Sequence, residues 1–453
     1  MKGISDEPQF PVCLLEGVTA LCDVIDNHIC EQTLSEKNAF FVADLGVVMR
    51  QYVRWRTHMA QVRPYYAVRC NSSPAVIAVL AALGTGFICT NKSEFELVQT
   101  HGVPSEDIIF SAVCKQVSQI KYAAKNGIGL LVCDNEAELR KISRWHPNAK
   151  LLLQVSTEAS CPDDDTSMTF GCSLKDCRHL LECAKELGMQ VIGVRCHISR
   201  SCEDGQVYIH AMSDARCVFD MGEEIGFNMK VLDIGGDFSG SEAHLESFYS
   251  AVINMVDLYF PPSTGVSIMA ELGSFFVSSA FTLAVNIISK EVVARDRQDQ
   301  DQDPDGTSPD DEPEFQYYMN EGVYGSFSGK LSEMLIAAPS VHKNISLDAP
   351  VFSSSLWGPS GDDLDKVVEH GLLPELNIGD WLIFTQAGAY SLGQPLCTAT
   401  DSPPPPVFCV ISSRDWFETL DIDVSNEAVL KSFSLVPYSL NCCQTEAALS
   451  APA

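Results

Sequence analysis

Basic residues are scarce in this sequence. Its 30 lysines and arginines face 60 aspartates and glutamates, so the formal net charge is −30 at pH 7. The phosphates of nucleic acids and the headgroups of anionic lipids repel a chain of this charge. We therefore expect neither nucleic acid nor membrane as a general partner, whereas attraction to a basic protein or to cations stays compatible with the composition.

Long hydrophobic runs are also missing. The longest apolar stretch, Phe275 to Ile288, is interrupted by two serines, a threonine and an asparagine, and is too short and too polar to span a bilayer. The first ten residues carry Asp6 and Glu7 and no apolar core of signal-peptide length. The sequence therefore predicts a cytoplasmic protein, with the nucleus as a further location.

The cysteines lack the spacing of a metal site or of a disulfide scaffold. The chain has 18 of them, about 4% of its residues and below the roughly 8 to 10% typical of disulfide-rich domains. It contains no C-x-x-C pair and no His/Cys cluster at zinc spacing. We predict reduced, mostly buried cysteines and no metal site.

What the sequence does have is an alternation of short β-rich runs with helical patterns. Eight strand candidates lie at residues 65–70, 87–90, 108–111, 130–135, 151–156, 191–197, 230–236 and 266–272. Seven segments with helical spacing separate them, and several end at a glycine. This pattern predicts a (β/α)8 TIM-type barrel over residues 45–275, with an open doubly wound sheet as the alternative.

After Gly273 the strand-like runs continue without helices between them, at residues 281–293, 314–319, 380–390 and 407–413. A β-rich domain is therefore predicted for residues 276–420. Residues 296–314 carry nine acidic side chains and one basic one, without aromatics, which predicts a disordered surface loop rather than a binding site. The prolines at 403–406 indicate a stiff connector, and residues 421–453 a divergent tail.

Reactive groups of a β/α barrel lie at the carboxyl ends of its strands. In this sequence those positions make a poor active site. His197 ends the sixth strand and Glu271 ends the eighth, and these two are the candidates for acid or base chemistry. The first strand ends at Arg69.

Several motifs carry a family resemblance: RPYYAVRCNSSP, KQVSQIKYAAKNG, VLDIGGDF, EGVYGSF, SSSLWGPS and GDWLIF. To about residue 420 the chain resembles eukaryotic ornithine decarboxylase, a two-domain pyridoxal-phosphate enzyme. Within that family, KNAFFVADLG and LLPELNIGDWLIF are most similar to the antizyme inhibitors, its non-enzymatic members. The resemblance implies that residues 1–44 pack on a Greek-key-like β domain and that the chain is a monomer, at most a weak dimer.

The resemblance places Arg69 where the decarboxylases carry their Schiff-base lysine. A guanidinium, with a pKa above about 12, cannot supply the deprotonated nitrogen that an aldimine requires. Two roles then stay open for Arg69. It could bind an anion, or it could be a structural ion-pair partner, which we favour.

The family's phosphate contacts are altered as well. Asp237 replaces the third glycine of L-D-I-G-G-G-F and sets a negative charge against the phosphate. Ser274 replaces the arginine of E-P-G-R, and the turn after His197 gains Arg200. One arginine does not offset these two changes, so we expect no tight phosphate binding and no cofactor.

Further family positions differ at Ile88, Gln154, Ser332, Glu333 and Gly361. The resemblance implies that the first two replace an aspartate and an arginine of the barrel. The other three replace the Tyr-Asp pair that reaches the substrate's amine and the cysteine that handles a proton. Asp362, His197, Glu271 and Tyr390 match the family. Without an aldimine they have no reaction to serve, and we expect them to satisfy one another in a polar cavity.

The resemblance also assigns an antizyme-binding element to residues 117–140. The residues expected to contact antizyme are Val117, Gln119, Ile120, Lys121, Tyr122, Lys125, Leu130, Glu138 and Arg140. Between Lys115 and Arg144 six basic residues face three acidic ones, a local reversal of charge. Composition alone favours an ordinary solvated helix face here, whereas the resemblance favours a partner surface.

Three functions therefore compete. The first is a binding protein that captures antizyme and so protects ornithine decarboxylase. The second is a pyridoxal-phosphate decarboxylase of a basic amino acid with an altered site, which Arg69 argues against. The third is an inactive subunit that pairs with an active decarboxylase, which the expected monomer argues against.

Overall fold

The structure is a computed structural model that describes residues 10–17, 19–32, 37–156, 171–197, 205–236, 242–293, 313–332, 334–342, 349–392, 403–420 and 433–438. The described residues form two compact units. One, the barrel unit, takes those of Val48–Phe276 and Thr419–Leu430. The other, the β unit, takes those of Met1–Val47, Val277–Glu418 and Lys431–Ala453.

The barrel unit is a closed, eight-stranded parallel barrel, which confirms the predicted architecture and excludes the open sheet. Its strands are β3 (Val62–Ala67), β4 (Gly86–Cys89), β5 (Ile108–Phe110), β6 (Leu130–Cys133), β7 (Lys150–Ser156), β8 (Gln190–His197), β9 (Val231–Asp233) and β10 (Ser267–Leu272). Strand β10 pairs with both β9 and β3 and so closes the ring. Each predicted barrel strand is present.

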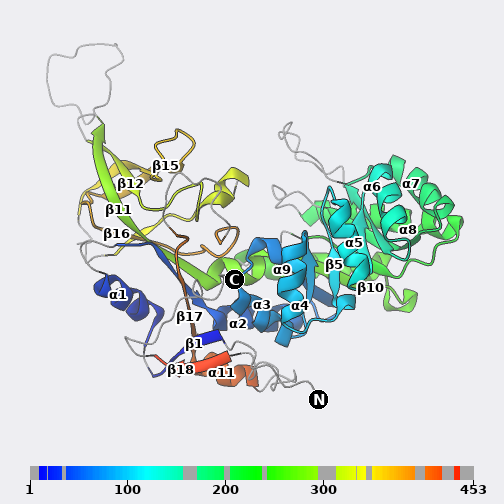
Figure 1. Ribbon diagram of the computed structural model, residues 1–453, viewed down its shortest axis with the longest axis horizontal. Coiled ribbons are helices and arrows are strands. Elements are labelled where there is room, and N and C mark those ends of the chain that lie inside the picture. Colours follow the sequence, from blue (N-terminus) through cyan, green and yellow to red (C-terminus); the bar gives the residue numbers. More distant parts are fainter. Residues whose placement is uncertain are drawn as a thin grey trace, which may run out of the picture. The chain divides into compact units, whose positions relative to one another are not determined.

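Helices connect the barrel strands and lie outside them, as Figure 1 shows for α5 to α8. The helices of the chain are α1 (Leu21–Glu31), α2 (Leu45–His58), α3 (Pro74–Ala82), α4 (Lys92–Thr100), α5 (Val117–Lys125), α6 (Glu136–Trp145), α7 (Leu174–Glu186), α8 (Gly205–Ile225), α9 (Glu242–Tyr259), α10 (Ser274–Val277) and α11 (Ser413–Leu420). Asn135 caps α6 by accepting a hydrogen bond from the Glu138 amide, and Ser173 caps α7. These caps fix where the two helices begin.

The inside of the barrel is filled by apolar side chains from several strands. The cluster comprises Tyr65, Ile88, Ile109, Val132, Leu152 and Met269. Gly86 makes room for one of them, because a Cβ at Gly86 would lie 2.3 Å from the Tyr65 ring. The interior is therefore a packed core rather than an open channel.

The first barrel strand ends earlier than predicted. Strand β3 stops at Ala67, whose partner is Ile88, and a 3-10 turn over Val68–Cys70 follows. The Tyr66 hydroxyl donates to the Asn71 carbonyl at 2.7 Å and holds this turn. Arg69 therefore lies beyond the strand rather than at its end, and its side chain is exposed.

The β unit is built on a ten-stranded mixed sheet. Its strands are β1 (Phe10–Leu15), β2 (Phe40–Asp44), β11 (Phe281–Val293), β12 (Glu314–Met319), β13 (Ser340–Val341), β14 (Val351–Trp357), β15 (Lys366–Pro374), β16 (Trp381–Phe384), β17 (Val407–Ser412) and β18 (Phe433–Pro437). The N-terminal strand β1 pairs with β17 and β18, and β2 pairs with β11 and β17. The N-terminal segment thus belongs to the β domain, as the resemblance implied.

Two features of the β unit differ from the sequence prediction. The run predicted over residues 380–390 is a strand only to Phe384, because Gln386 and Tyr390 adopt positive φ angles that an extended chain does not allow. Strand β18 lies inside the predicted tail. The acidic loop lies outside the described residues apart from Pro313 and Glu314, and so do residues 441–453.

Two further predictions concern cysteines and membrane spans. The structure describes thirteen cysteines, all of them free, and nine are buried. No helix in the described ranges is both long enough and apolar enough to cross a bilayer.

Candidate functional site

A buried arginine lies between two carboxylates near the carboxyl ends of the barrel strands. Arg195 on β8 donates from Nη1 to Asp233 Oδ2 on β9 at 3.0 Å and from Nη2 to Glu271 Oε2 on β10. Arg195 is 6% exposed and Asp233 is fully buried. We call these three residues the barrel-mouth triad.

The register of the strands brings the triad together. Gln154 on β7 is the partner of Arg195, and Arg195 is in turn the partner of Asp233. Glu271 lies two residues beyond Met269, which pairs with Asp233. Side chains two residues apart on a strand share a face, so all of them point to the same side of the barrel wall.

The charges of the triad depend on one another. Burial alone lowers the pKa of Arg195, but Glu271 and Asp233 more than offset it, so the arginine keeps its charge. Burial raises the pKa of Asp233 to about 6, although Arg195 and the Gly235 amide act in the opposite direction. The carboxylates are therefore stabilised in the barrel wall by the guanidinium between them.

Sequence reasoning missed Arg195 and Asp233. A signal for Arg195 existed, because it lies two residues before His197 and so on the same face of β8. Charged residues inside buried parallel strands are uncommon and call for a partner. The prediction considered only the last residue of each strand and so overlooked this position.

Two of the four matched family residues have partners within their own units. Glu271 is bound by Arg195. Asp362 is exposed in the β unit, where it accepts from the Tyr324 hydroxyl at 2.8 Å and from the Leu364 amide. The side chain of His197 lies outside the described set. The prediction that these residues satisfy one another in a polar cavity is wrong for Asp362, which is exposed, and stays a prediction for His197, Glu271 and Tyr390.

The other predicted positions are dispersed. Ile88 and Gln154 are buried in the barrel, Ser274 is half-buried at the start of α10, and Gly361 occupies a turn of the β unit at φ +72°. Arg69 is exposed and forms no ion pair with another described residue, although its charge partly offsets the burial that raises the pKa of Glu94. The favoured structural ion pair of Arg69 is therefore not observed. Asp237, Arg200 and Glu333 lie outside the described residues, as does the side chain of Ser332.

The two remaining glycines of the family's phosphate turn are required by the barrel itself. Gly235 has a φ of +87°, and a Cβ there would lie 2.7 Å from the Cys196 carbonyl oxygen. A Cβ at Gly236 would lie 3.0 Å from the Glu271 carbonyl oxygen. Their presence is explained by backbone packing and is no sign of a bound phosphate.

The predicted antizyme-binding residues lie on α5, β6 and α6. Lys121, Lys125 and Arg140 are exposed, whereas Val117, Gln119, Tyr122 and Leu130 are half-buried. The Lys121 ammonium lies 3.9 Å from the centroid of the Trp145 ring, which ties α5 to α6. We call this set the α5–α6 surface.

Two members of the predicted set are not surface residues. Ile120 is fully buried beneath α5, because it lies on the helix face that packs on the barrel. Glu138 is 6% exposed and pairs with Lys141 and with the buried Lys115. Lys115 and Glu138 are both internal and their charges cancel, so the net excess of positive charge predicted for this segment is unchanged at the surface.

One group of potential metal ligands was also missed. Glu136 on α6 and His179 and Cys183 on α7 bring three ligand atoms within 4.8 Å of one another. The prediction of no metal site relied on sequence spacing, and Glu136 precedes His179 by 43 residues. Only the packing of α6 against α7 brings them together.

Comparisons with known proteins agree with this architecture. The model of the pyridoxal-dependent decarboxylase family, pyridoxal-binding domain, matches residues 45–278. Antizyme inhibitor 1 of Mus musculus is 52% identical over 98% of this chain and 99% of its own length, and ornithine decarboxylase of Rattus norvegicus is 45% identical over 88% and 87%. The chain belongs to the family of antizyme inhibitors and ornithine decarboxylases. A solved structure, the arginine decarboxylase of Paramecium bursaria Chlorella virus bound to agmatine, matches with a TM-score of 0.74 at 27% identity over 86% of this chain and 99% of that one.

The residues of this family member do not fit pyridoxal phosphate. The glutamate that the resemblance pairs with the cofactor's ring nitrogen is Glu271, and here Arg195 already occupies its carboxylate. Arg69 cannot replace the Schiff-base lysine. Among the described residues the buried lysine is Lys115. Burial lowers its pKa, but its ammonium donates to the Ala112 carbonyl and lies 3.9 Å from Glu138. We therefore derive no chemical step through this cofactor.

Proposed function

We propose that this chain is a non-enzymatic homologue of ornithine decarboxylase that binds antizyme. By competing for antizyme it relieves the inhibition and degradation of ornithine decarboxylase, and so raises polyamine synthesis and uptake. The carrying observation is the Arg195–Glu271 pair, in which the guanidinium takes the place that the resemblance gives to the cofactor's ring nitrogen, in a chain whose relatives include proteins named antizyme inhibitors.

The geometry of the α5–α6 surface supports a binding role. Tyr122 stacks on Phe95 of α4 with ring centroids 6.1 Å apart, and Lys121 lies over Trp145 of α6. Neighbouring helices therefore hold the side chains of α5 in place before any partner arrives. A surface ordered in advance loses less conformational entropy on binding.

Charge on this surface suits the same role. Lys121 and Lys125 are one turn apart on α5 and both are exposed, while the chain as a whole is strongly acidic. Exposed charges at the edge of an interface mainly set the association rate and the choice of partner. Half-buried apolar neighbours such as Leu130 would supply contact area.

The test is a calorimetric titration of the purified chain with antizyme at fixed salt concentration. We expect a dissociation constant on the order of 1 to 100 nM for the unchanged chain. The variant Lys121→Glu/Lys125→Glu should weaken binding at least about tenfold, because it reverses both charges of the surface. Pyridoxal phosphate added to the same sample should give no absorbance band that borohydride fixes to the chain.

The matched control is Lys175→Glu/Lys185→Glu. These two lysines are also exposed, lie in the first and last turns of α7, and change the net charge by the same amount. The control should bind antizyme as the unchanged chain does. The proposal is contradicted if the unchanged chain does not bind antizyme, or if both variants weaken binding equally. A cofactor band fixed by borohydride would restore the decarboxylase hypothesis.

A further inference from the structure

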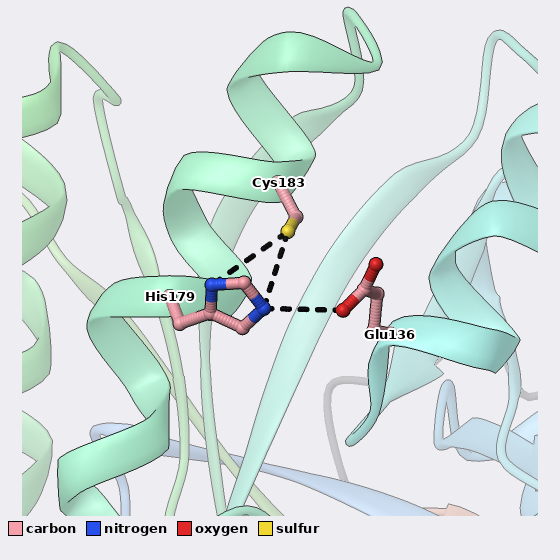
Figure 2. A group of neighbouring side chains, drawn as sticks. All are labelled: Glu136, His179 and Cys183. Atoms are coloured by element: carbon pink, nitrogen blue, oxygen red, sulfur yellow. Dashed lines mark hydrogen bonds and ion pairs between the residues drawn. The ribbon is translucent and has the colours of Figure 1, made fainter.

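The cluster of Glu136, His179 and Cys183 lies on the outside of the barrel, away from the barrel-mouth triad. His179 and Cys183 are four residues apart on α7 and so share one face of that helix. Figure 2 shows both side chains directed toward Glu136, which lies in the first turn of the neighbouring α6. Three side chains of different chemistry from two helices therefore converge on one point.

The distances between the ligand atoms match those of a coordination shell. His179 Nε2 lies 3.1 Å from Glu136 Oε2 and 3.6 Å from Cys183 Sγ. Tetrahedral zinc, with bonds of about 2.0 to 2.3 Å, separates a nitrogen from an oxygen ligand by about 3.4 Å and from a sulfur ligand by about 3.6 Å. All three ligand atoms lie within 4.8 Å of one another, so side-chain rotations complete the shell around a metal ion without movement of the two helices.

The donor set selects the class of metal. Thiolate and imidazole ligands suit zinc and similar borderline ions, whereas calcium and magnesium require oxygen ligands. The side chain of His179 is 63% exposed and that of Glu136 is 38% exposed, so an ion reaches the cluster from solvent. Cys183 is only 6% exposed, so its sulfur is largely shielded from solvent, unlike the other two ligands.

Arg140 completes the arrangement without competing for the metal. Its Nε donates to Glu136 Oε1 at 2.7 Å, while His179 contacts the other carboxylate oxygen, Oε2. A cation placed between Nε2 and Oε2 therefore leaves the Arg140 hydrogen bond intact. Hydrogen bonds of this kind orient a carboxylate ligand and strengthen metal sites.

We propose that Glu136, His179 and Cys183 form a binding site for a zinc-class divalent cation that links α6 to α7. The metal takes the place of the Nε2 proton of His179, which moves through solvent to Nδ1 so that the imidazole stays neutral, and the Cys183 thiol releases its proton to solvent as the sulfur–metal bond forms. Three protein ligands leave one coordination position for water. The proposal does not rest on the proposed function, although Arg140 belongs to the α5–α6 surface and bonds to Glu136. Cobalt binding and antizyme binding are measured separately, so the failure of one is distinguishable from the failure of the other.

Cobalt(II) titration of the full-length, reduced and metal-free chain tests the site, because a thiolate ligand gives a sulfur-to-cobalt charge-transfer band. We expect one cobalt per chain and loss of the band when zinc is added. Loss of an outer hydrogen bond around a metal weakens binding about 10- to 100-fold, so Cys183→Ala and His179→Gln should weaken it at least about tenfold. Cys183→Ala should also abolish the charge-transfer band.

The control is Cys217→Ala, which removes another cysteine, an exposed one on α8. This variant should bind cobalt as the unchanged chain does. His179 is mostly exposed, so His179→Gln empties no core and a loss of binding is not a loss of the fold. The proposal is overturned if the unchanged chain shows no band, or if the band persists at unchanged affinity in Cys183→Ala or His179→Gln.

Discussion

Arg195 places a permanent positive charge between two carboxylates that are themselves shielded from water. Removing one partner of such a group leaves the others buried and uncompensated, which typically costs about 3 to 5 kcal/mol. Taking three charges out of water costs free energy, and their mutual attraction does not fully offset that cost. The triad is therefore weak evidence that the fold is stable. Its effect is to fix which groups occupy the barrel mouth.

We expect Arg195→Met to lower the free energy of unfolding by about 3 to 5 kcal/mol at neutral pH, because Asp233 and Glu271 lose their counter-charge. Urea denaturation followed by fluorescence measures the change. The double variant Arg195→Met/Glu271→Gln should recover part of the loss, since one uncompensated charge is then removed. A single-variant loss below about 1 kcal/mol would show that water or a rearranged side chain compensates the carboxylates.

The loss in free energy of unfolding that Arg195→Met causes should also grow as the pH rises from about 5 to about 8. The pKa of Asp233 is already about 6 with the arginine present, and removing that positive charge raises it further. The folded variant then binds more protons than the unfolded chain, so its stability falls with increasing pH. Denaturation at several pH values checks the direction, and a deficit that shrinks with increasing pH contradicts the assignment.

At the scale of elements, strand β8 shows how closely the barrel strands approach. The register of β7 and β8 shifts between Leu151 and Leu152, so β8 carries a bulge just before Gly193. A Cβ at Gly193 would lie 1.9 Å from the Val231 carbonyl oxygen on β9. Only glycine fits this position, and the bulge at Ile192 lies three residues before Arg195.

We expect Gly193→Ala to destabilise the barrel unit by about 1 to 3 kcal/mol, because the added methyl group forces backbone strands apart. Thermal and chemical denaturation measure the loss. Gly129→Ala is the control, since the nearest atom to a Cβ there lies 4.0 Å away. Equal stability of the two variants would show that β8 and β9 can separate without cost.

The elements themselves were largely predictable from the sequence. Runs such as residues 281–293 and 314–319 coincide with β11 and β12, because local alternation and β-branched residues indicate a strand wherever it pairs. The Glu136–His179–Cys183 cluster was not predictable. Its ligands belong to two helices whose adjacency follows from the order of strands in the barrel, which no local pattern contains.

At the scale of the whole molecule, the two ends of the described chain meet in one sheet. Strand β18 pairs in parallel with β1, with Phe10 opposite Phe433 and Leu14 opposite Pro437. This pairing joins residues more than 400 positions apart and could not be read from the sequence, where the same segment was assigned to a divergent tail. The short edge strand with a proline also covers the edge of β1.

Ending the chain after Leu420 should expose the free edge of β1. Hydrogen exchange should then lose protection at least about tenfold in the amides of β1, while amides of β4 in the barrel unit stay protected. A chain that ends after Tyr438 keeps β18 and is the matched control, and it should exchange as the unchanged chain does. Unchanged protection of β1 in the shorter chain would mean that β17 alone suffices to order it.

Arg195 also changes how the protein depends on its surroundings. A cofactor that neutralises a buried glutamate stabilises the fold only in proportion to its concentration, and the protein loosens when the supply falls. A guanidinium attached to the chain has no dissociation constant and is present at synthesis. Glu271 therefore has a counter-ion that cannot be washed away or diluted, and its charge in the barrel wall is balanced from within the chain.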